Sequence, residues 1–259
     1  MTGPERSDDN GPMSRHLERK AHYPRRRLLR LLLRGLIHAA LATLTRFEVE
    51  GRENVPRTGP LLVAGNHFHF IDPVALIRAI PRPLEFVGGL RMPFAPRFVT
   101  FLPRLWGYYA VKRGTPSREA LRAAEDVLRQ GGAIGIFPEG GSWATVLRPP
   151  RGGAAFLATR TGALIVPVGL DGLPEIFPSL RRLRRAKVTI RIGAPIGPFT
   201  AEGKGREHRA ALDRIGDEIL RAVSCLIPPE RRGHYSDDPA LREAAKKVEH
   251  YPWDDAPEV

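Results

Sequence analysis

Short apolar runs alternate with amphipathic stretches along most of the chain, and Gly and Pro residues separate them. Some of the apolar runs are continuous, which is typical of strands buried on both faces of a sheet. We expect strands at residues 61–65, 84–88, 107–111, 133–137, 164–170 and 188–192, and helices at 73–80, 117–130, 153–161, 206–226 and 238–248. This alternation predicts an α/β fold, a single layered domain with a mixed, mostly parallel sheet flanked by helices.

A different pattern precedes these strands. Residues 1–24 have no apolar period and predict a disordered tail, whereas residues 25–47 set leucines at helical spacing among arginines and predict a basic amphipathic helix. Its longest stretch without a charged residue is too short for the roughly 20 residues that cross a bilayer. A signal peptide is a poor fit, because no small-residue cleavage site follows.

We expect this helix to lie in the membrane interface, with leucines among the acyl chains and arginines against anionic lipid. The alternative is a helix that packs on its own domain with snorkelling arginines. The chain then divides into a tail (1–24), an interfacial helix (25–47), a layered domain (48–228) and a C-terminal extension (229–259).

Composition narrows the class of protein. The 259 residues are 42% hydrophobic and 27% charged, as in ordinary globular proteins. Lys and Arg number 41 against 28 Asp and Glu, a net charge of +13 that favours an anionic partner such as lipid head groups, nucleic acid or phosphorylated metabolites. The single cysteine, Cys225, excludes an intramolecular disulfide and a Cys-based zinc cluster. No phosphate-binding P-loop, dinucleotide fingerprint or serine-hydrolase elbow is present.

Candidate chemistry begins after the first of the expected strands, at Asn66-His-Phe-His-Phe-Ile-Asp-Pro73. Asp72 followed by Pro favours a helix start with Asp as the N-cap. A loop that folds back onto this start can pair His67 with Asp72, the arrangement of a general base whose ring is held by a carboxylate. Alternatively Asp72 only caps the helix and His67 is a polar loop residue, or His67 and His69 form a metal pair, for which no third ligand is evident.

Three further segments end strands with polar residues. Lys112 and Arg113 follow the strand at 107–111, where an arginine can fork onto a phosphate. Glu139 follows the strand at 133–137, at the carboxyl end where α/β proteins tend to bind ligands. Pro167 would interrupt a central ladder and so predicts a bulge or an edge strand. A basic cluster at 181–187 either joins a membrane-facing surface, attracts an acidic carrier protein, or is a solvated turn.

Taken in this order, the segments resemble the glycerolipid acyltransferase family typified by 1-acylglycerol-3-phosphate acyltransferase, over about residues 49–199. The specific parts are the N-H-x4-D box at 66–72 and the F-P-E-G box at 137–140. The resemblance implies that His67 deprotonates the acceptor hydroxyl and that Asp72 orients His67 and balances its charge. It also implies that Arg113, with Lys112 beside it, and Glu139 hold the glycerol phosphate. Gly140 would allow close approach, and Pro167 would lie in the box that shapes the acyl-donor side.

The chain departs from the family at two places. Lys112 precedes Arg113 where other members often have an acidic or polar residue, which predicts a more electropositive acceptor pocket. The family commonly continues F-P-E-G with Thr and Arg, whereas this chain has Gly141 and Ser142. The cation expected for phosphate binding is absent there, and Arg148 and Arg151 are the candidates to replace it.

The resemblance implies a fatty acyl transfer from acyl-CoA or acyl carrier protein to the free hydroxyl of a lysophospholipid, with 1-acylglycerol-3-phosphate as the first choice. It implies no metal, no prosthetic group and no covalent acyl-enzyme, and we expect a peripheral protein on the cytoplasmic face of the membrane. The alternatives are acylation of another lysolipid or of a lipid-linked amine or sugar, and a non-catalytic basic module that binds membrane or nucleic acid. Against nucleic acid, the 19 aromatic residues (11 Phe, 5 Tyr, 3 Trp) form no basic-aromatic strip for stacking bases.

Overall fold

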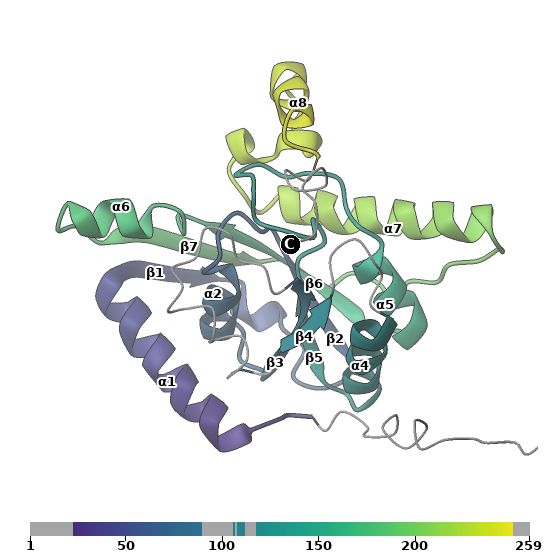
Figure 1. Cartoon of the computed structure of the whole chain (residues 1–259), viewed down its shortest axis with the longest axis horizontal. Coiled ribbons are helices and arrows are strands. Elements are labelled where there is room, and N and C mark those ends of the chain that lie inside the picture. Colours follow the sequence, from purple (N-terminus) through teal and green to yellow (C-terminus); the bar gives the residue numbers. More distant parts are fainter. Residues whose placement is uncertain (1–22, 90–105, 107, 112–117, 251–259) are drawn as a thin grey trace, which may run out of the picture.

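The computed structural model describes residues 23–89, 106, 108–111 and 118–250. In this part of the chain one seven-stranded sheet has the order β1-β7-β6-β2-β5-β3-β4, and β6 and β7 are its only antiparallel neighbours (Figure 1). The mixed, mostly parallel sheet predicted from the alternation is confirmed. The strands are β1 (Thr45–Glu50), β2 (Leu61–Gly65), β3 (Leu84–Gly89), β4 (Tyr108–Val111), β5 (Ala133–Ile136), β6 (Leu164–Asp171) and β7 (Ala186–Ile192).

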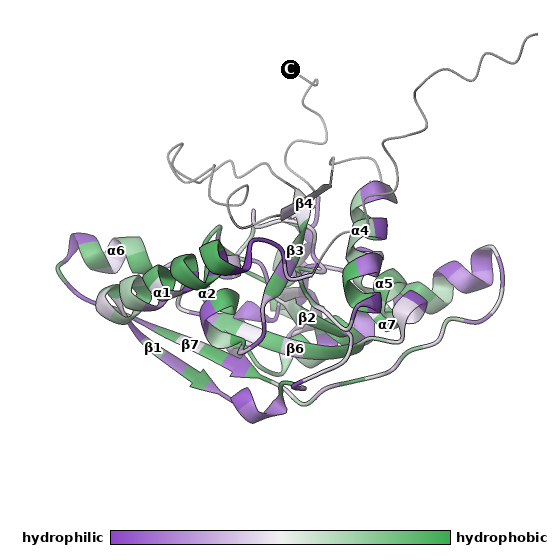
Figure 2. Ribbon diagram, turned by 90° about the horizontal axis from the view of Figure 1, so that it is seen from below, coloured by the Kyte–Doolittle hydropathy of each residue, from purple (hydrophilic) through white to green (hydrophobic). Residues whose placement is uncertain are grey.

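Helices cover both faces of the sheet (Figure 2). Along β2, Leu61 and Val63 pack into a core with α1 and α2, whereas Leu62 and Ala64 pack into a second core with α4, α5 and α7. Successive strand residues point to opposite faces, so burial on both sides explains the continuous apolar run. The α-helices are α1 (Arg27–Leu44), α2 (Asp72–Ala79), α4 (Arg118–Arg129), α5 (Gly153–Thr161), α6 (Ile176–Arg181), α7 (Arg206–Ser224) and α8 (Pro239–Lys246), and the short 3-10 helices are η2 (Arg52–Asn54), η4 (Pro229–Arg231) and η5 (Gly233–Tyr235).

Besides the short 3-10 helices, the structure adds a strand and an α-helix that the sequence pattern did not predict. The N-terminal helix ends at Leu44 rather than near residue 47, because Thr45 turns into β1, which pairs in parallel with β7. The domain boundary expected at residue 48 therefore falls inside a strand. The second element is α6, a short helix immediately before the basic cluster.

Two of the three arginines of α1, Arg30 and Arg34, face inward, whereas Arg27 is exposed. Arg30 is 4% exposed and forms hydrogen bonds of 2.6 and 2.7 Å with both carboxylate oxygens of Glu85, and Arg34 donates to the carbonyl of Ile80 at 3.0 Å. The prediction that the arginines meet lipid is wrong for these two, because Glu85 and a free carbonyl lie beneath the helix. The outward face carries leucines instead, with exposed fractions of 83% at Leu28, 58% at Leu31, 64% at Leu32 and 59% at Leu36.

The sheet topology gathers several segments at one edge. The parallel strands β2, β5 and β6 all end at this edge, and β7 runs antiparallel to β6, so the amino ends of β7 and β1 lie there too. The loops after β2 and β5, the segment from α6 into β7 and the end of α1 therefore share one side of the molecule, which we call the dyad edge.

Pro167 lies in β6, in the interior of the sheet. The ladder between β6 and β7 pairs Val168 with Ile192, and it resumes as a bridge between Ile165 and Ile196. The β7 side thus has one residue more than the β6 side between these pairs, which is a β-bulge. Pro167 itself pairs in register with Ala64 of β2, so the parallel ladder on that side is continuous; the expectation of an edge strand is wrong, and the irregularity lies in the segment after β7.

The C-terminal elements pack on the segment that follows β5. The backbone of Leu147 accepts from His234 at 2.9 Å and donates to the carbonyl of Arg231 at 3.0 Å, and the indole of Trp143 donates to the carbonyl of Val248 at 2.9 Å. Residues 229–248 are therefore part of the fold. None of the helices in the described ranges has the length and apolar character needed to span a bilayer.

Candidate active site

His67 and Asp72 lie side by side after β2. The Nδ1 atom of His67 is 2.8 Å from Oδ2 of Asp72, and this oxygen also accepts from the backbone N–H groups of Phe68 and His69, each at 2.7 Å. Because a carboxylate only accepts hydrogen bonds, the proton lies on Nδ1 and Nε2 is left able to take another. The imidazole stacks on Phe137 with 4.1 Å between the ring centroids, which fixes its plane. The loop does fold back as expected and brings the two side chains together.

Asp72 is the first residue of α2 and not its N-cap. The N-cap position is Ile71, and no side chain caps the helix there. An N-cap side chain accepts from the N–H groups of the next two or three residues, whereas the Asp72 carboxylate accepts from the loop that precedes it. The prediction of Asp72 as N-cap is therefore wrong, and its carboxylate orders the loop and the imidazole.

Asn66 fixes the point at which this loop leaves the sheet. Its side chain is fully buried, donates to the carbonyl of Leu170 at 2.9 Å and accepts from the N–H of the same residue at 2.7 Å. The end of β2 is thereby tied to the end of β6. Sequence reasoning assigned Asn66 no role, although an amide directly after a buried strand was the available signal.

Glu139 holds the backbone of His67 from behind. Its Oε1 accepts from the His67 N–H at 2.8 Å, and its Oε2 accepts from the backbone N–H and the Nε of Arg148, each at 3.2 Å. Both Glu139 and Arg148 are 1% exposed. These contacts differ from the substrate-binding role that the resemblance implies for Glu139 and from the phosphate-binding role considered for Arg148. Each side chain is turned into the protein and engaged with the other.

Burial controls the charge of this pair. It raises the pKa of Glu139 to about 7, against the opposing effect of the Arg148 guanidinium beside it, and it lowers the pKa of Arg148. The guanidinium also donates to the carbonyl of Gly141 and stacks 3.6 Å from the ring centroid of Trp143. Its Nη1 is buried and has no hydrogen-bond partner. Trp143, which the sequence did not single out, therefore links the C-terminal elements to Arg148.

Arg151 is the exposed cation of this segment. Gly140 has φ +79°, and a Cβ placed on it would lie 2.7 Å from Cδ of Arg151, so the glycine is needed both for the left-handed turn and for the close passage of that side chain. Of the two candidates to replace the missing family arginine, Arg148 is buried and Arg151 is exposed.

The remaining expected site residues are placed as follows. Lys112 and Arg113 lie outside the described residues. Pro167 is buried within β6. The side chain of His69 is not part of the dyad: burial lowers its pKa, its buried Nδ1 has no hydrogen-bond partner, and its ring contacts Phe70 and Phe177.

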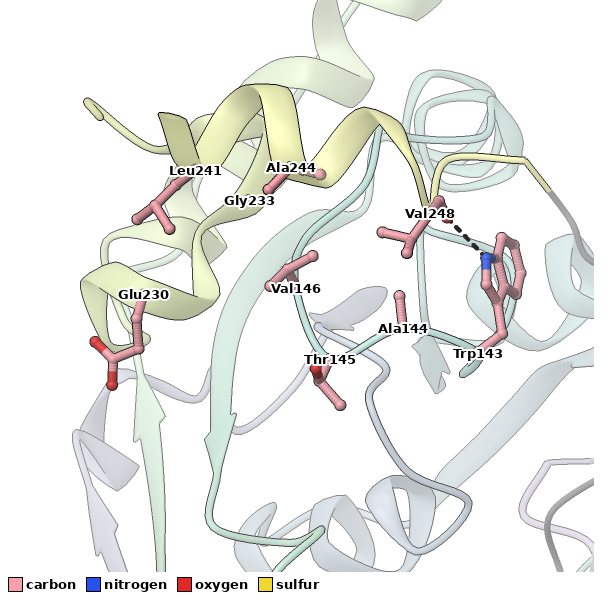
Figure 3. Close-up of a pocket in the computed structure, with 10 residues that line it drawn as sticks. Trp143, Ala144, Thr145, Val146, Glu230, Gly233, Leu241, Ala244 and Val248 are labelled. Carbon is pink, nitrogen blue, oxygen red and sulfur yellow. Dashed lines mark hydrogen bonds between the residues drawn. The ribbon is translucent and has the colours of Figure 1, made fainter. Parts of the chain in front are cut away.

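A cavity of about 350 Å³ lies between the segment at 143–146 and the C-terminal elements η4, η5 and α8 (Figure 3). Apolar side chains such as Val146 and Leu241 line much of it, and the hydrogen bond from Trp143 to Val248 closes one side (Figure 3). Neither His67 nor Asp72 lines this cavity, so it lies apart from the dyad.

Part of the chain is similar to known acyltransferases. A sequence model described as Acyltransferase matches residues 46–171. A 1-acyl-sn-glycerol-3-phosphate acyltransferase of Borreliella burgdorferi is 32% identical over 140 residues, 50% of this chain and 52% of that protein. The enzyme of the same name from Bacillus subtilis is 24% identical over 68% of this chain and 87% of its own length.

The fold is also similar to a solved structure. The crystal structure of the 1-acyl-sn-glycerophosphate (LPA) acyltransferase PlsC from Thermotoga maritima superposes with a TM-score of 0.51 at 22% identity, and covers 73% of this chain and 78% of that chain. This chain spans about half the length of the Borreliella relative and of a chloroplastic acyltransferase from Arabidopsis thaliana. The matched region contains both boxes, with His67 and Asp72 in contact and Glu139 behind them, and residues 46–171 of this chain are similar to the Acyltransferase family.

Proposed function

We propose that the protein transfers a fatty acyl group from a thioester, acyl-CoA or acyl carrier protein, to the free hydroxyl of a lysophospholipid, with 1-acylglycerol-3-phosphate as the acceptor. The observation that carries the proposal is the 2.8 Å contact between His67 and Asp72, which leaves Nε2 of the imidazole as a base at the dyad edge. The names of the relatives support the acceptor class.

The chemistry needs no nucleophile from the protein. Nε2 of His67 takes the proton of the acceptor hydroxyl as its oxygen attacks the thioester carbonyl, and Asp72 balances the positive charge that forms on the ring. The new C–O bond forms, the C–S bond breaks, and the thiolate leaves with the proton that the imidazolium returns. Glu139 acts on this step through the backbone of His67 and is a positioning residue.

The acceptor phosphate needs a cation within reach of the dyad, and the exposed Arg151 beside Gly140 supplies one in the described part of the loop after β5. We propose that Arg113 also binds the acceptor phosphate, as the family resemblance implies, and that Lys112, which departs from the family, adds a second positive charge next to it in the sequence.

Membrane attachment follows from the outward face of α1. Four leucines are exposed on this face, whereas Arg30 and Arg34 lie on the opposite face of the helix. The helix therefore presents apolar side chains outward and keeps two of its charges against the domain. We propose that this face inserts among lipid acyl chains and holds the protein peripherally on the cytoplasmic face of the membrane.

Purified protein, labelled acyl-CoA and a panel of lysophospholipids test the proposal. His67→Ala and Asp72→Asn are each expected to lower kcat by roughly 10²- to 10⁴-fold, whereas His69→Ala, a histidine in the same loop outside the dyad, retains most activity. A His67→Ala variant with near-parental kcat would contradict the assignment. Arg151→Gln is expected to raise KM for the phosphate-bearing acceptor and to leave KM for acyl-CoA unchanged.

A further inference from the structure

The turn between α6 and β7 exposes a leucine among arginines. Leu183 is 97% exposed, more than any other large apolar side chain in the described residues. The flanking cations are also exposed: Arg181, Arg182, Arg184, Arg185 and Lys187. We call residues 181–187 the basic turn.

Leu183 gains little from the fold in this position. Its φ is +55°, in the left-handed region that glycine adopts freely and a bulky apolar residue rarely does. A leucine side chain disfavours this left-handed backbone conformation, and here it also remains exposed to water. Local folding therefore does not explain a leucine at this position. A leucine at this position is explained by a partner outside the chain that accepts an apolar side chain between cations.

The basic turn lies on the same side of the molecule as the dyad. It runs from the last residue of α6 into the first two residues of β7, whose amino end is at the dyad edge. On one side α6 reaches the active-site loop, because Phe177 stacks on Phe70 with 5.9 Å between the centroids. On the other side the guanidinium of Arg185 donates to the carbonyls of Ala42 and Thr45, at the end of α1. Figure 1 shows α6 beside β7 and β1, at the same end of the sheet as the end of α1.

The charges of the basic turn are not equally available. Lys187 pairs with Glu48 at 3.0 Å, and Arg185 is engaged with α1. Arg181, Arg182 and Arg184 are exposed around Leu183. An anionic bilayer surface fits this arrangement, since lipid phosphates meet the cations while the leucine enters the acyl region.

We propose that the basic turn is a second membrane contact, in which Leu183 inserts into an anionic bilayer between Arg182 and Arg184. Together with α1 it turns the dyad edge toward the bilayer, which holds the proposed lysophospholipid acceptor. The inference rests on the proposed attachment through α1, and it adds an orientation that one helix lying in the interface does not fix.

Leu183→Gly separates a membrane role of Leu183 from a structural one. A structural role predicts a lower Tm, whereas a membrane role predicts an unchanged or higher Tm together with weaker vesicle binding. Glycine relieves the left-handed conformation, so the variant is expected to have a Tm equal to or above that of the parent. The lost leucine is expected to weaken co-flotation with vesicles of 30% anionic lipid roughly tenfold. An unchanged vesicle affinity would overturn the proposal, whatever the Tm.

A matched charge pair completes the experiment. Arg184→Gln is expected to weaken binding to anionic vesicles about fivefold and binding to neutral vesicles little, since each cation near such a surface contributes a similar amount. Arg57→Gln removes an exposed charge before β2, at the opposite edge of the sheet. This substitution is expected to change neither the binding to anionic vesicles nor the binding to neutral vesicles. Equal effects of the two substitutions would overturn the proposal.

Two further outcomes distinguish the alternatives. If Arg184→Gln weakens binding of an acidic acyl carrier protein and leaves vesicle binding intact, the basic turn is a docking site for the donor protein and the proposal is wrong. If the parent does not bind vesicles at all, the attachment through α1 fails as well. A parent that binds through α1 alone, with Leu183→Gly indistinguishable from it, leaves the proposed function standing and removes only the second contact.

Discussion

Arg148→Met perturbs the buried ion pair behind the catalytic histidine. Methionine fills a similar apolar volume but removes the guanidinium that faces Glu139, whose side chain is fully buried. Breaking a buried pair by removing one partner typically costs about 3–5 kcal/mol, because the other charge is left without compensation. Against a typical unfolding free energy of about 5–15 kcal/mol, this is a large loss.

The pH dependence of this loss follows from the pKa of Glu139. Burial raises it from 4.5 to about 7, so the folded state holds the proton more tightly than the unfolded chain. The associated stability is fully present below pH 4.5 and is lost as the pH rises through 7, a change of roughly 3 kcal/mol at about 1.4 kcal/mol for each pKa unit. Without Arg148 the pKa rises further, so the destabilisation by Arg148→Met is expected to be larger at pH 8 than at pH 5.

Urea unfolding followed by circular dichroism at pH 5 and pH 8 measures both effects. Arg129→Met is the control, because Arg129 forms an ion pair with Glu125 but its side chain is 61% exposed, and a loss below about 1 kcal/mol is expected. The double variant Glu139→Gln/Arg148→Met removes both charges and is expected to be more stable than Arg148→Met at pH 8. Equal losses at Arg148 and Arg129, or a double variant no better than the single one, would refute the reasoning.

Three other substitutions test contacts that position the site. Asn66→Ala leaves both backbone groups of Leu170 buried without partners; we expect a loss of about 2–4 kcal/mol in urea unfolding and reduced kcat, and parental values would contradict the proposed tie between β2 and β6. Trp143→Phe keeps an aromatic ring but loses the bond to Val248; we expect a loss of about 1 kcal/mol and faster amide exchange in α8, and unchanged exchange would refute the link. Glu85→Gln weakens the buried anchor of α1 and is expected to speed proteolysis within α1, whereas unaltered cleavage would show that the anchor is dispensable.

The sequence by itself determined the elements whose pattern is local. The continuous apolar runs gave β2 with its exact limits, and the helix expected at 153–161 is α5. A strand buried on both faces and a short apolar helix are each readable within one window of residues, because burial acts on every position of the window in the same way. The order of the boxes likewise indicated the family and brought His67 and Asp72 forward as a pair only five residues apart.

Tertiary structure decided the contacts that join distant residues. β1 has the alternating, half-exposed pattern of an edge strand. Its first three residues fall within the helix predicted at 25–47 and no strand is predicted for the rest, since only the pairing with β7 makes this segment a strand. The amphipathic pattern of α1 was legible, but the buried carboxylate of Glu85, more than 50 residues away, turned Arg30 inward and the leucines outward.

The same distinction applies within the site. The residue types at Asp72, Glu139 and Arg148 indicated charge and hydrogen bonding, and the sequence could not say which partner each would have. The loop after β2 places three donors on Oδ2 of Asp72, and the helix begins at Asp72 itself, so this residue is not the N-cap. Glu139 reaches the backbone of His67 across 72 positions of chain, and burial commits it to that contact. Residue identity and local period are properties of the sequence, whereas the partner of a buried charge is set by which segments the sheet brings to one edge.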